Sequence, residues 1–161
     1  MFEIFHIAQS LIANITAIIV LLFLSAFFSG SETALTAASQ ARLHQLSLRG
    51  NRRASTVLRL RRRNDTLIGT ILIGNNITNI AASALATSVL ISLFDDAGVA
   101  YAMVGMTILV VIFAEVLPKT FAINNADRSA LAVGPTIRVF VWLFQPLSIA
   151  TRFVAVSYTH L

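Results

Sequence analysis

The residues with the clearest chemical potential lie in the stretch Val111–Lys119, where Glu115 interrupts an otherwise apolar sequence. An ionisable side chain at membrane depth costs at least ~3 kcal/mol, so it indicates a functional site and needs a partner. Lys119 lies four residues later, which is the favourable spacing for an ion pair on a helix. Pro118 lacks an amide hydrogen and therefore leaves the carbonyl of Ala114 without its helical donor. A carboxylate and a backbone oxygen thus become available at one depth.

Two further groups of polar residues interrupt apolar sequence. The first combines hydroxyls with a glycine and ends in a carboxylate: Ser25, Ser29, Gly30, Ser31 and Glu32. Ser25 and Ser29 share a helix face, and Gly30 permits either a break in the helix or a close approach. The second group is Gly74-Asn75-Asn76. Each asparagine amide needs several partners where water is absent, so both asparagines are candidate ligands. Glu32 lies near the end of its apolar stretch, where it is either solvated or part of the site.

All the donors in these three groups are oxygen atoms, from hydroxyl, amide, carboxylate and backbone carbonyl groups. Such a set suits hard cations such as Mg²⁺, Ca²⁺ or Na⁺ and suits Zn²⁺ or copper poorly. Mg²⁺ takes six oxygens at ~2.1 Å and gives up water reluctantly. A single carboxylate helped by neutral dipoles would therefore hold it weakly enough for release. Lys119 either neutralises Glu115 between ion-binding events or extends to the membrane interface.

The composition places these residues in a membrane protein. Of the 161 residues, 57% are hydrophobic and 12% are charged, which is outside the usual range of soluble domains. The absence of cysteine excludes disulfides and thiolate metal sites. Three apolar stretches predict transmembrane helices at about residues 8–33, 66–94 and 98–122. We expect an all-α protein with one transmembrane domain over residues 1–128 and further helices on the cytoplasmic side of the membrane.

Basic residues are concentrated in the connection between the first two spans. Eight of the twelve lie between Arg42 and Arg63. The positive-inside rule makes this loop cytoplasmic, which places the N-terminus outside and the C-terminus in the cytoplasm of a bacterial inner-membrane protein. No aromatic residues alternate with the arginines, so membrane lipids are favoured over nucleic acid as the partner.

Residues 129–161 are predicted to form a helical region next to the membrane. The apolar part, residues 139–150, is about half as long as a bilayer-crossing helix, so we read it as interfacial, with a fourth span as the alternative. Trp142, Arg138 and Arg152 suit an interface position. The last six residues carry no domain signal and are read as a truncated end or a tag-like tail.

Three stretches, taken together and in order, resemble the transmembrane domain of the CorC/CNNM (cyclin M) family, also called DUF21 proteins. They are Phe28-Ser29-Gly30-Ser31-Glu32-Thr33-Ala34-Leu35, Gly74-Asn75-Asn76 and Glu115-Val116-Leu117-Pro118-Lys119. The resemblance implies a three-helix transmembrane domain that works as a homodimer in Mg²⁺ transport, for which Na⁺ coupling is proposed. The residues that it places in the ion pocket are Ser25, Ser29, Gly30, Ser31, Asn75, Asn76 and Glu115. Family members usually continue into cytosolic CBS domains that bind adenine nucleotides, and we expect this chain to end before them.

The predicted function is therefore Mg²⁺ transport by a secondary exporter, through an oxygen-lined pocket around Glu115. The alternative is a membrane anchor or sensor module whose activity lies in a cytosolic region outside this chain. We expect no enzyme, because the spans contain no aspartate pair, no Ser/His arrangement and no HExxH motif.

Overall fold

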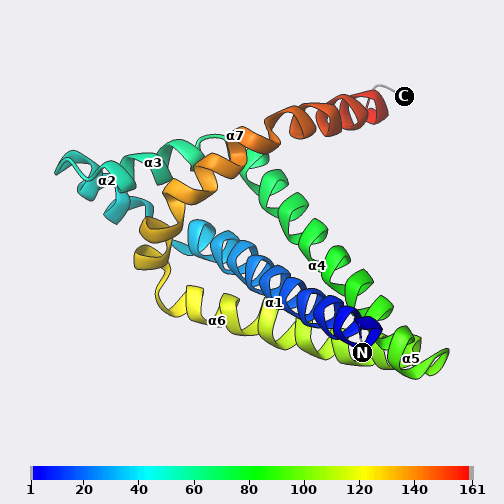
Figure 1. Cartoon of the computed structure of the whole chain (residues 1–161). Helices are drawn as coiled ribbons and strands as arrows, with labels where there is room; N and C mark the ends of the chain where they lie inside the picture. The colour runs from blue at the N-terminus through cyan, green and yellow to red at the C-terminus, as the bar shows by residue number, and fades with distance from the viewer. Residues whose placement is uncertain (1, 160–161) are drawn as a thin grey trace. The chain divides into compact units, whose positions relative to one another are not determined.

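Helices make up all the regular structure that the computed structural model describes, which covers the backbone of residues 2–159 and the side chains of residues 9–144. In chain order they are α1 (Phe2–Ala37), α2 (Gln40–Leu48), α3 (Arg52–Arg61), α4 (Asn64–Phe94), α5 (Ala97–Leu109), the π-helix η1 (Val110–Val116), α6 (Leu117–Asn124) and α7 (Ala126–Thr159) (Figure 1). The predicted all-α class is confirmed.

Three helical segments of the described part are long and apolar enough to cross a membrane. They are Gln9–Ala37, Asn64–Phe94 and Ala97–Asn124, and they overlap the three predicted spans. The third is one continuous helical run made of α5, η1 and α6. Only 11% of the apolar window of the first segment is buried, and 22% in each of the other two. Most of their apolar surface is thus available to lipid, which makes the chain a multi-pass membrane protein.

The chain divides into two compact units. Unit 1 consists of residues 1–29 and 74–118, and unit 2 consists of residues 30–73 and 119–161. The division passes through α1, α4 and α6. Unit 1 therefore contains most of the apolar helical length, whereas unit 2 contains the basic helices α2 and α3 together with α7.

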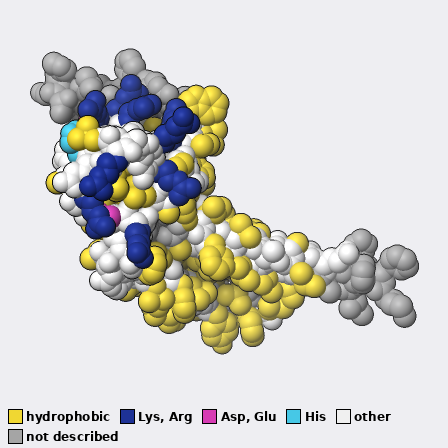
Figure 2. Space-filling view, turned by 90° about the vertical axis from the view of Figure 1, so that its left-hand side faces the viewer, with side chains coloured by type: hydrophobic (Ala, Val, Ile, Leu, Met, Phe, Trp, Pro, Cys, Tyr) yellow, Lys and Arg dark blue, Asp and Glu magenta, His cyan; other side chains and the backbone are white. Residues whose placement is uncertain are grey.

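Small side chains let the helices of unit 1 pack closely. Its buried centre is formed by Ala82 and Ala86 of α4 and Met106 of α5, with Ile18, Leu21 and Leu22 of α1 and Val110 of η1 packed around it. Alanine at a helix contact allows the backbones to approach, which is how transmembrane helices gain packing energy. Many other large apolar side chains are exposed, and Figure 2 shows hydrophobic side chains gathered away from the Lys and Arg side chains in that view.

A two-residue turn joins α4 to α5. Asp95 has a positive φ of 52°, a conformation that aspartate tolerates better than most residues. A side chain at Gly98 would collide with the backbone of Leu90 and Ile91. The turn can therefore reverse the chain within two residues, Asp95 and Asp96.

Caps at both ends of a short connection define the helical hairpin α2–α3 of unit 2. Gly50 adopts a positive φ of 86° directly after α2, where glycine is the preferred residue. Asn51 then caps α3, because its Oδ1 accepts hydrogen bonds from the amides of Arg53 (3.0 Å) and Ala54 (3.2 Å). The chain thus ends one helix at Leu48 and begins the next at Arg52.

Helix α7 packs against α3 within unit 2. Val57 of α3 and Ile137 of α7 are completely buried. A Cβ atom on Gly134 would lie 2.7 Å from Cγ2 of Val57, so only glycine allows this approach. The absence of a side chain at one position therefore sets the spacing of the two helices.

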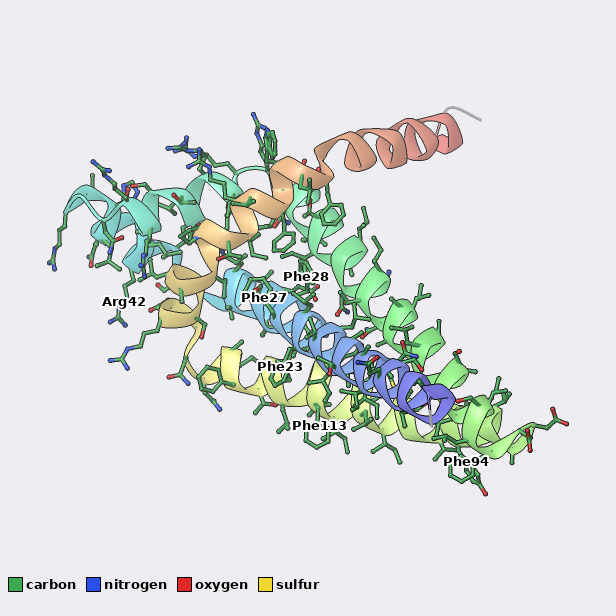
Figure 3. All side chains as sticks on the ribbon, in the orientation of Figure 1. Phe23, Phe27, Phe28, Arg42, Phe94 and Phe113 are labelled. Carbon is green, nitrogen blue, oxygen red and sulfur yellow. The ribbon has the colours of Figure 1, made fainter. Side chains whose placement is uncertain are left out.

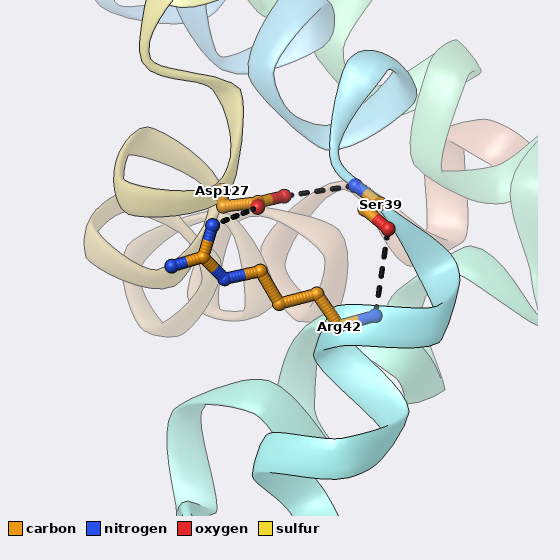
Figure 4. A network of polar contacts seen from close by, with 3 residues as sticks. All are labelled: Ser39, Arg42 and Asp127. Carbon is orange, nitrogen blue, oxygen red and sulfur yellow. Dashed lines mark hydrogen bonds and ion pairs between the residues drawn. The ribbon is translucent and has the colours of Figure 1, made fainter.

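Polar contacts of Asp127 join the first turn of α7 to the start of α2. Its Oδ1 accepts a hydrogen bond of 2.8 Å from the Ser39 amide, and its Oδ2 lies 3.2 Å from Nη1 of Arg42 (Figure 4). Nη1 of Arg61 also donates a 2.7 Å hydrogen bond to the carbonyl of Ala38. The linker between α1 and α2 is thus held by residues far from it in sequence.

The structure settles two points of helix continuity. Helix α1 runs unbroken through Gly30, so the break that this glycine permits is not present. Helix α7 continues through Pro135 and Pro146 to Thr159, so residues 139–150 are helical. Their interfacial or membrane-crossing position stays a prediction, because the side chains from residue 145 onward, including Arg152 and the final tail, lie outside the described residues.

Candidate ion-binding site

Three oxygen atoms converge at the polar centre of unit 1. Oγ of Ser25 lies 2.7 Å from Oδ1 of Asn75 and 2.6 Å from Oδ1 of Asn79. We call these three atoms the oxygen cluster. Ser25 is 0% exposed, and its hydroxyl has one proton, which it can donate to only one of the two amide oxygens. The other amide oxygen is then left without a hydrogen-bond donor. Every atom of the cluster gains a partner either when one amide turns its NH₂ group towards Ser25 or when a cation binds the three oxygens.

Close packing of α1 on α4 brings the oxygen cluster together. A Cβ atom on Gly74 would lie 2.6–2.8 Å from three ring atoms of Phe28. The Phe28 ring is 2% exposed and lies on α1 one turn after Ser25 (Figure 3). Gly74 therefore allows the approach that puts Ser25 within hydrogen-bond distance of Asn75. This close approach explains why a glycine precedes the two asparagines in the Gly74-Asn75-Asn76 motif.

Asn79 is a member of the oxygen cluster that the predicted site residues do not include. It lies four residues after Asn75 and so shares its helix face. This spacing is the sequence feature from which Asn79 could have been predicted as a site residue. Thr78, in contrast, donates to the carbonyls of Gly74 (3.0 Å) and Asn75 (2.9 Å) on its own helix.

Glu115 lies in the π-helix η1, which was not predicted. The Leu117 amide donates to the carbonyl of Ile112, five residues earlier, in place of the usual four. Such segments are rare and occur frequently at functional sites. The side chain of Glu115 is half-buried, and its carboxylate has no hydrogen-bond or ion-pair partner among the described residues. A charge in an apolar span is thus left available for a ligand.

Pro118, the second residue of α6, limits the number of amide donors beside Glu115. It has no N–H for Ala114, four residues earlier, or for Phe113, five residues earlier. The turn around Glu115 therefore has fewer amide donors than carbonyl acceptors. The potential ligands within the apolar helices of unit 1 are thus the carboxylate of Glu115, the backbone oxygens beside it and the neutral oxygen cluster.

The other predicted site residues of unit 1 occupy different environments. Ser29 is buried one turn after Ser25, on the same face of α1. Asn76 is exposed, and none of the hydrogen bonds of the oxygen cluster involves it. The structure thus brings together Ser25 and Asn75, adds Asn79, and leaves the side chain of Asn76 on an open surface.

Gly30, Ser31, Glu32 and Lys119 belong to unit 2, and their part in the site stays a prediction. Ser31 is 1% exposed, and its Oγ has no hydrogen-bond partner among the described residues. Oγ1 of Thr70 is also buried and has no hydrogen-bond partner among the described residues. Thr70 was not predicted as a site residue, although it lies one turn before Gly74 on α4. A buried hydroxyl without a partner costs ~1–3 kcal/mol, so both require an explanation.

Within the described residues, no three His, Cys, Asp or Glu side chains come close enough to hold a metal ion. A site of the zinc type therefore has no candidate there. The donors that do come together are neutral oxygens, which favour a hard cation held loosely.

The Cyclin M transmembrane N-terminal domain matches residues 16–159 of this chain. The chain belongs to this family. The predicted resemblance, which was based on three motifs, is thereby confirmed. All three motifs of this cyclin M chain fall inside the matched range.

Curated relatives carry descriptions of their own. The UPF0053 inner membrane protein YfjD of Escherichia coli is 47% identical over 124 residues, which are 77% of this chain and 29% of YfjD. A UPF0053 protein of Haemophilus influenzae is 41% identical over 130 residues, 81% of this chain and 31% of that protein. The polyamine export protein of Haemophilus influenzae is 27% identical over 158 residues, 90% of this chain and 35% of that protein. The cyclin M chain thus spans about a third of the length of these relatives.

Proposed function

We propose that this chain carries Mg²⁺ across the membrane through a pocket in unit 1, with Glu115 as the charged ligand and the oxygen cluster as neutral ligands. The observation that carries the proposal is the convergence of two amide oxygens on the buried hydroxyl of Ser25, which has a single proton. A cation would satisfy all three oxygens at once, whereas hydrogen bonding requires one amide to turn. Glu115 in η1 is half-buried, and it is the only acidic residue of α5 and η1.

Weak binding is what this proposal requires of the ion site. Mg²⁺ prefers carboxylate and water oxygens in octahedral geometry, and one carboxylate with neutral dipoles falls short of a tight site. An ion that is held this way can enter and leave, as transport demands. Na⁺ uses the same oxygen donors, so an exchange of Na⁺ for Mg²⁺ at one pocket is the coupling that we propose for export.

The assembly and orientation form part of the same proposal. A homodimer and a cytoplasmic position of α2 and α3 are proposed from the family resemblance and from the positive-inside rule. The large exposed apolar area of the spans leaves room for a second copy as well as for lipid.

Polyamine export is the second candidate, because one relative carries that description. A groove of about 690 Å³ in unit 1, lined mainly by apolar side chains of α4, α5 and η1, begins beside Asn79 and would admit a methylene chain. A polyamine, however, carries several ammonium groups that each need an acceptor of negative charge. None of the groove residues is acidic, so we favour the smaller ion.

The decisive experiment is ion flux into liposomes that contain the purified chain and a Mg²⁺-sensitive dye. Glu115→Gln is expected to abolish Mg²⁺ flux, because it removes the charge while keeping the shape. Ser25→Ala and Asn79→Ala are expected to reduce the flux severalfold. Thr16→Val is the matched control, because Thr16 is an exposed hydroxyl of α1 that bonds only its own helix at Ile12.

Three results would redirect the proposal. Wild-type flux from folded Glu115→Gln protein would refute the assigned ligand. Saturable spermidine flux without Mg²⁺ flux would establish the second candidate. Flux of neither cation, together with no thermal stabilisation by Mg²⁺, would support the alternative function, a membrane anchor or sensor module whose activity lies in a cytosolic region outside this chain.

A further inference from the structure

A pocket of unit 2 combines positive charge with an apolar wall. It has a volume of about 260 Å³ and lies between α3, α7 and the first turn of α4. Its charged lining consists of Arg59, Arg63 and Arg138, and its apolar lining includes Leu67 and Trp142. We propose that this arginine–tryptophan pocket binds the phosphate group of an anionic membrane lipid, with the lipid tail lying over Trp142.

The described lining of the arginine–tryptophan pocket carries positive charge and contains no acidic side chain. Asp127, a carboxylate of the same unit, is occupied by Arg42 and the Ser39 amide. The Lys and Arg side chains of unit 2 gather on the face seen in Figure 2. Guanidinium groups bind phosphate oxygens in a bidentate manner, so three of them favour a phosphate over a carboxylate or a neutral headgroup.

The apolar wall distinguishes a lipid from a soluble phosphate. Trp142 is 73% exposed although it is the largest apolar side chain of the chain. Tryptophan is enriched at membrane–water interfaces, where one end of its ring meets lipid and the other meets water. A soluble phosphate would use the arginines and leave this ring in water. A glycerophospholipid would cover both.

The size of the pocket fits a headgroup and leaves the tail outside. Pockets that enclose whole drug-sized ligands start at ~300 Å³, and this one is smaller. A second hollow of about 350 Å³ adjoins it and is lined by Pro135 and Val139 together with the shared residues Arg138 and Trp142. The two hollows meet at one arginine and one tryptophan, which gives the lipid backbone a path along α7.

The sequence position of the pocket agrees with the depth of lipid headgroups. Arg63 directly precedes Asn64, the first residue of the 31-residue apolar span α4. The arginine–tryptophan pocket therefore lies at the end of a span, where each arginine near an anionic surface contributes ~1 kcal/mol. This inference is independent of the transported ion.

The single tryptophan of the chain makes the proposal directly testable, because Trp142 is the source of all tryptophan fluorescence. The purified chain in neutral detergent is titrated with phosphatidylglycerol or phosphatidylcholine that carries brominated tails, which quench tryptophan on contact. We expect saturable quenching at lower concentrations of the anionic lipid. Arg63→Gln and Arg138→Gln are each expected to raise the half-saturating concentration about fivefold, whereas Arg138→Lys retains most of the binding.

The matched control is Arg53→Gln, which removes an exposed charge from the same helix α3 but lies outside the pocket lining. Equal quenching by the two lipids would overturn the proposal, as would an equal effect of Arg53→Gln and Arg138→Gln. Inorganic phosphate forms the third arm. Release of the brominated lipid by phosphate at concentrations similar to those of the lipid would overturn the lipid assignment in favour of a soluble ligand.

Discussion

Substitution of Gly74 by alanine tests the close approach of α1 and α4 most directly. The added Cβ would lie 2.6–2.8 Å from three ring atoms of Phe28, well inside the ~3.5–4.0 Å at which two carbon atoms attract each other best. The ring is buried, so it cannot swing into solvent without moving its neighbours. Overpacking of this kind costs ~1–3 kcal/mol, which corresponds to a fall in melting temperature of roughly 2–12 °C for a domain of this size.

Thermal unfolding of the purified protein in detergent measures this effect. Gly105→Ala is the matched control, because a Cβ at Gly105 meets no atom within 4 Å. That substitution should be neutral or stabilising, since alanine is the better helix former by about 1 kcal/mol. The difference between the two variants therefore isolates the contact with Phe28 from the general effect of replacing glycine in a helix.

A second substitution separates a steric effect from a loss of flexibility. Phe28→Leu removes the ring atoms that Gly74→Ala would meet, so the double variant should recover a large part of the lost stability. Ser25 should also regain its distance to Asn75, which Mg²⁺ flux reports. Equal melting temperatures for Gly74→Ala and Gly105→Ala would refute the reasoning, and so would a double variant that shows no recovery.

The remaining predictions concern unit 2 and use the same unfolding assay. Asn51→Ala should destabilise the chain by ~1 kcal/mol because two amides of α3 lose their cap, whereas Asn51→Asp should retain it; equal losses would show that the cap is not the cause. Asp127→Asn should cost less than ~1 kcal/mol, because the exposed ion pair with Arg42 is worth little while the bond from Ser39 remains. Asp127→Ala removes both and should cost more, and equal effects of the two changes would contradict this assignment.

The spans were predictable because they depend on local sequence, and candidate site residues could be selected for the same reason. Long apolar runs leave few alternatives to membrane helices, and a carboxylate or two adjacent asparagines within such runs are conspicuous. Asn79 has the right spacing, but its membership in the oxygen cluster depends on which face of α4 meets α1. A pattern in one helix carries no information about its neighbour.

Other features depend on hydrogen-bond register or on distant contacts. The π-helix around Glu115 differs from an α-helix by one residue in each bond, and side-chain periodicity does not reveal this. Gly30 was read as a permitted break, yet one glycine in a long helix costs only about 1 kcal/mol, which the flanking turns outweigh. The bond from Ser39 to Asp127 joins residues 88 positions apart, which only the tertiary structure can show.

The π-helix η1 also has a consequence for the comparison of related chains. A turn closed by a bond to the fifth preceding residue contains one residue more than a turn closed by a bond to the fourth. Deletion of one residue between Val110 and Ala114 would therefore restore an ordinary helix without moving the ends of α5 and α6 far apart. A relative that is one residue shorter in this stretch should be aligned with its gap inside η1, so that its acidic residue is matched to Glu115 and is not scored as lost.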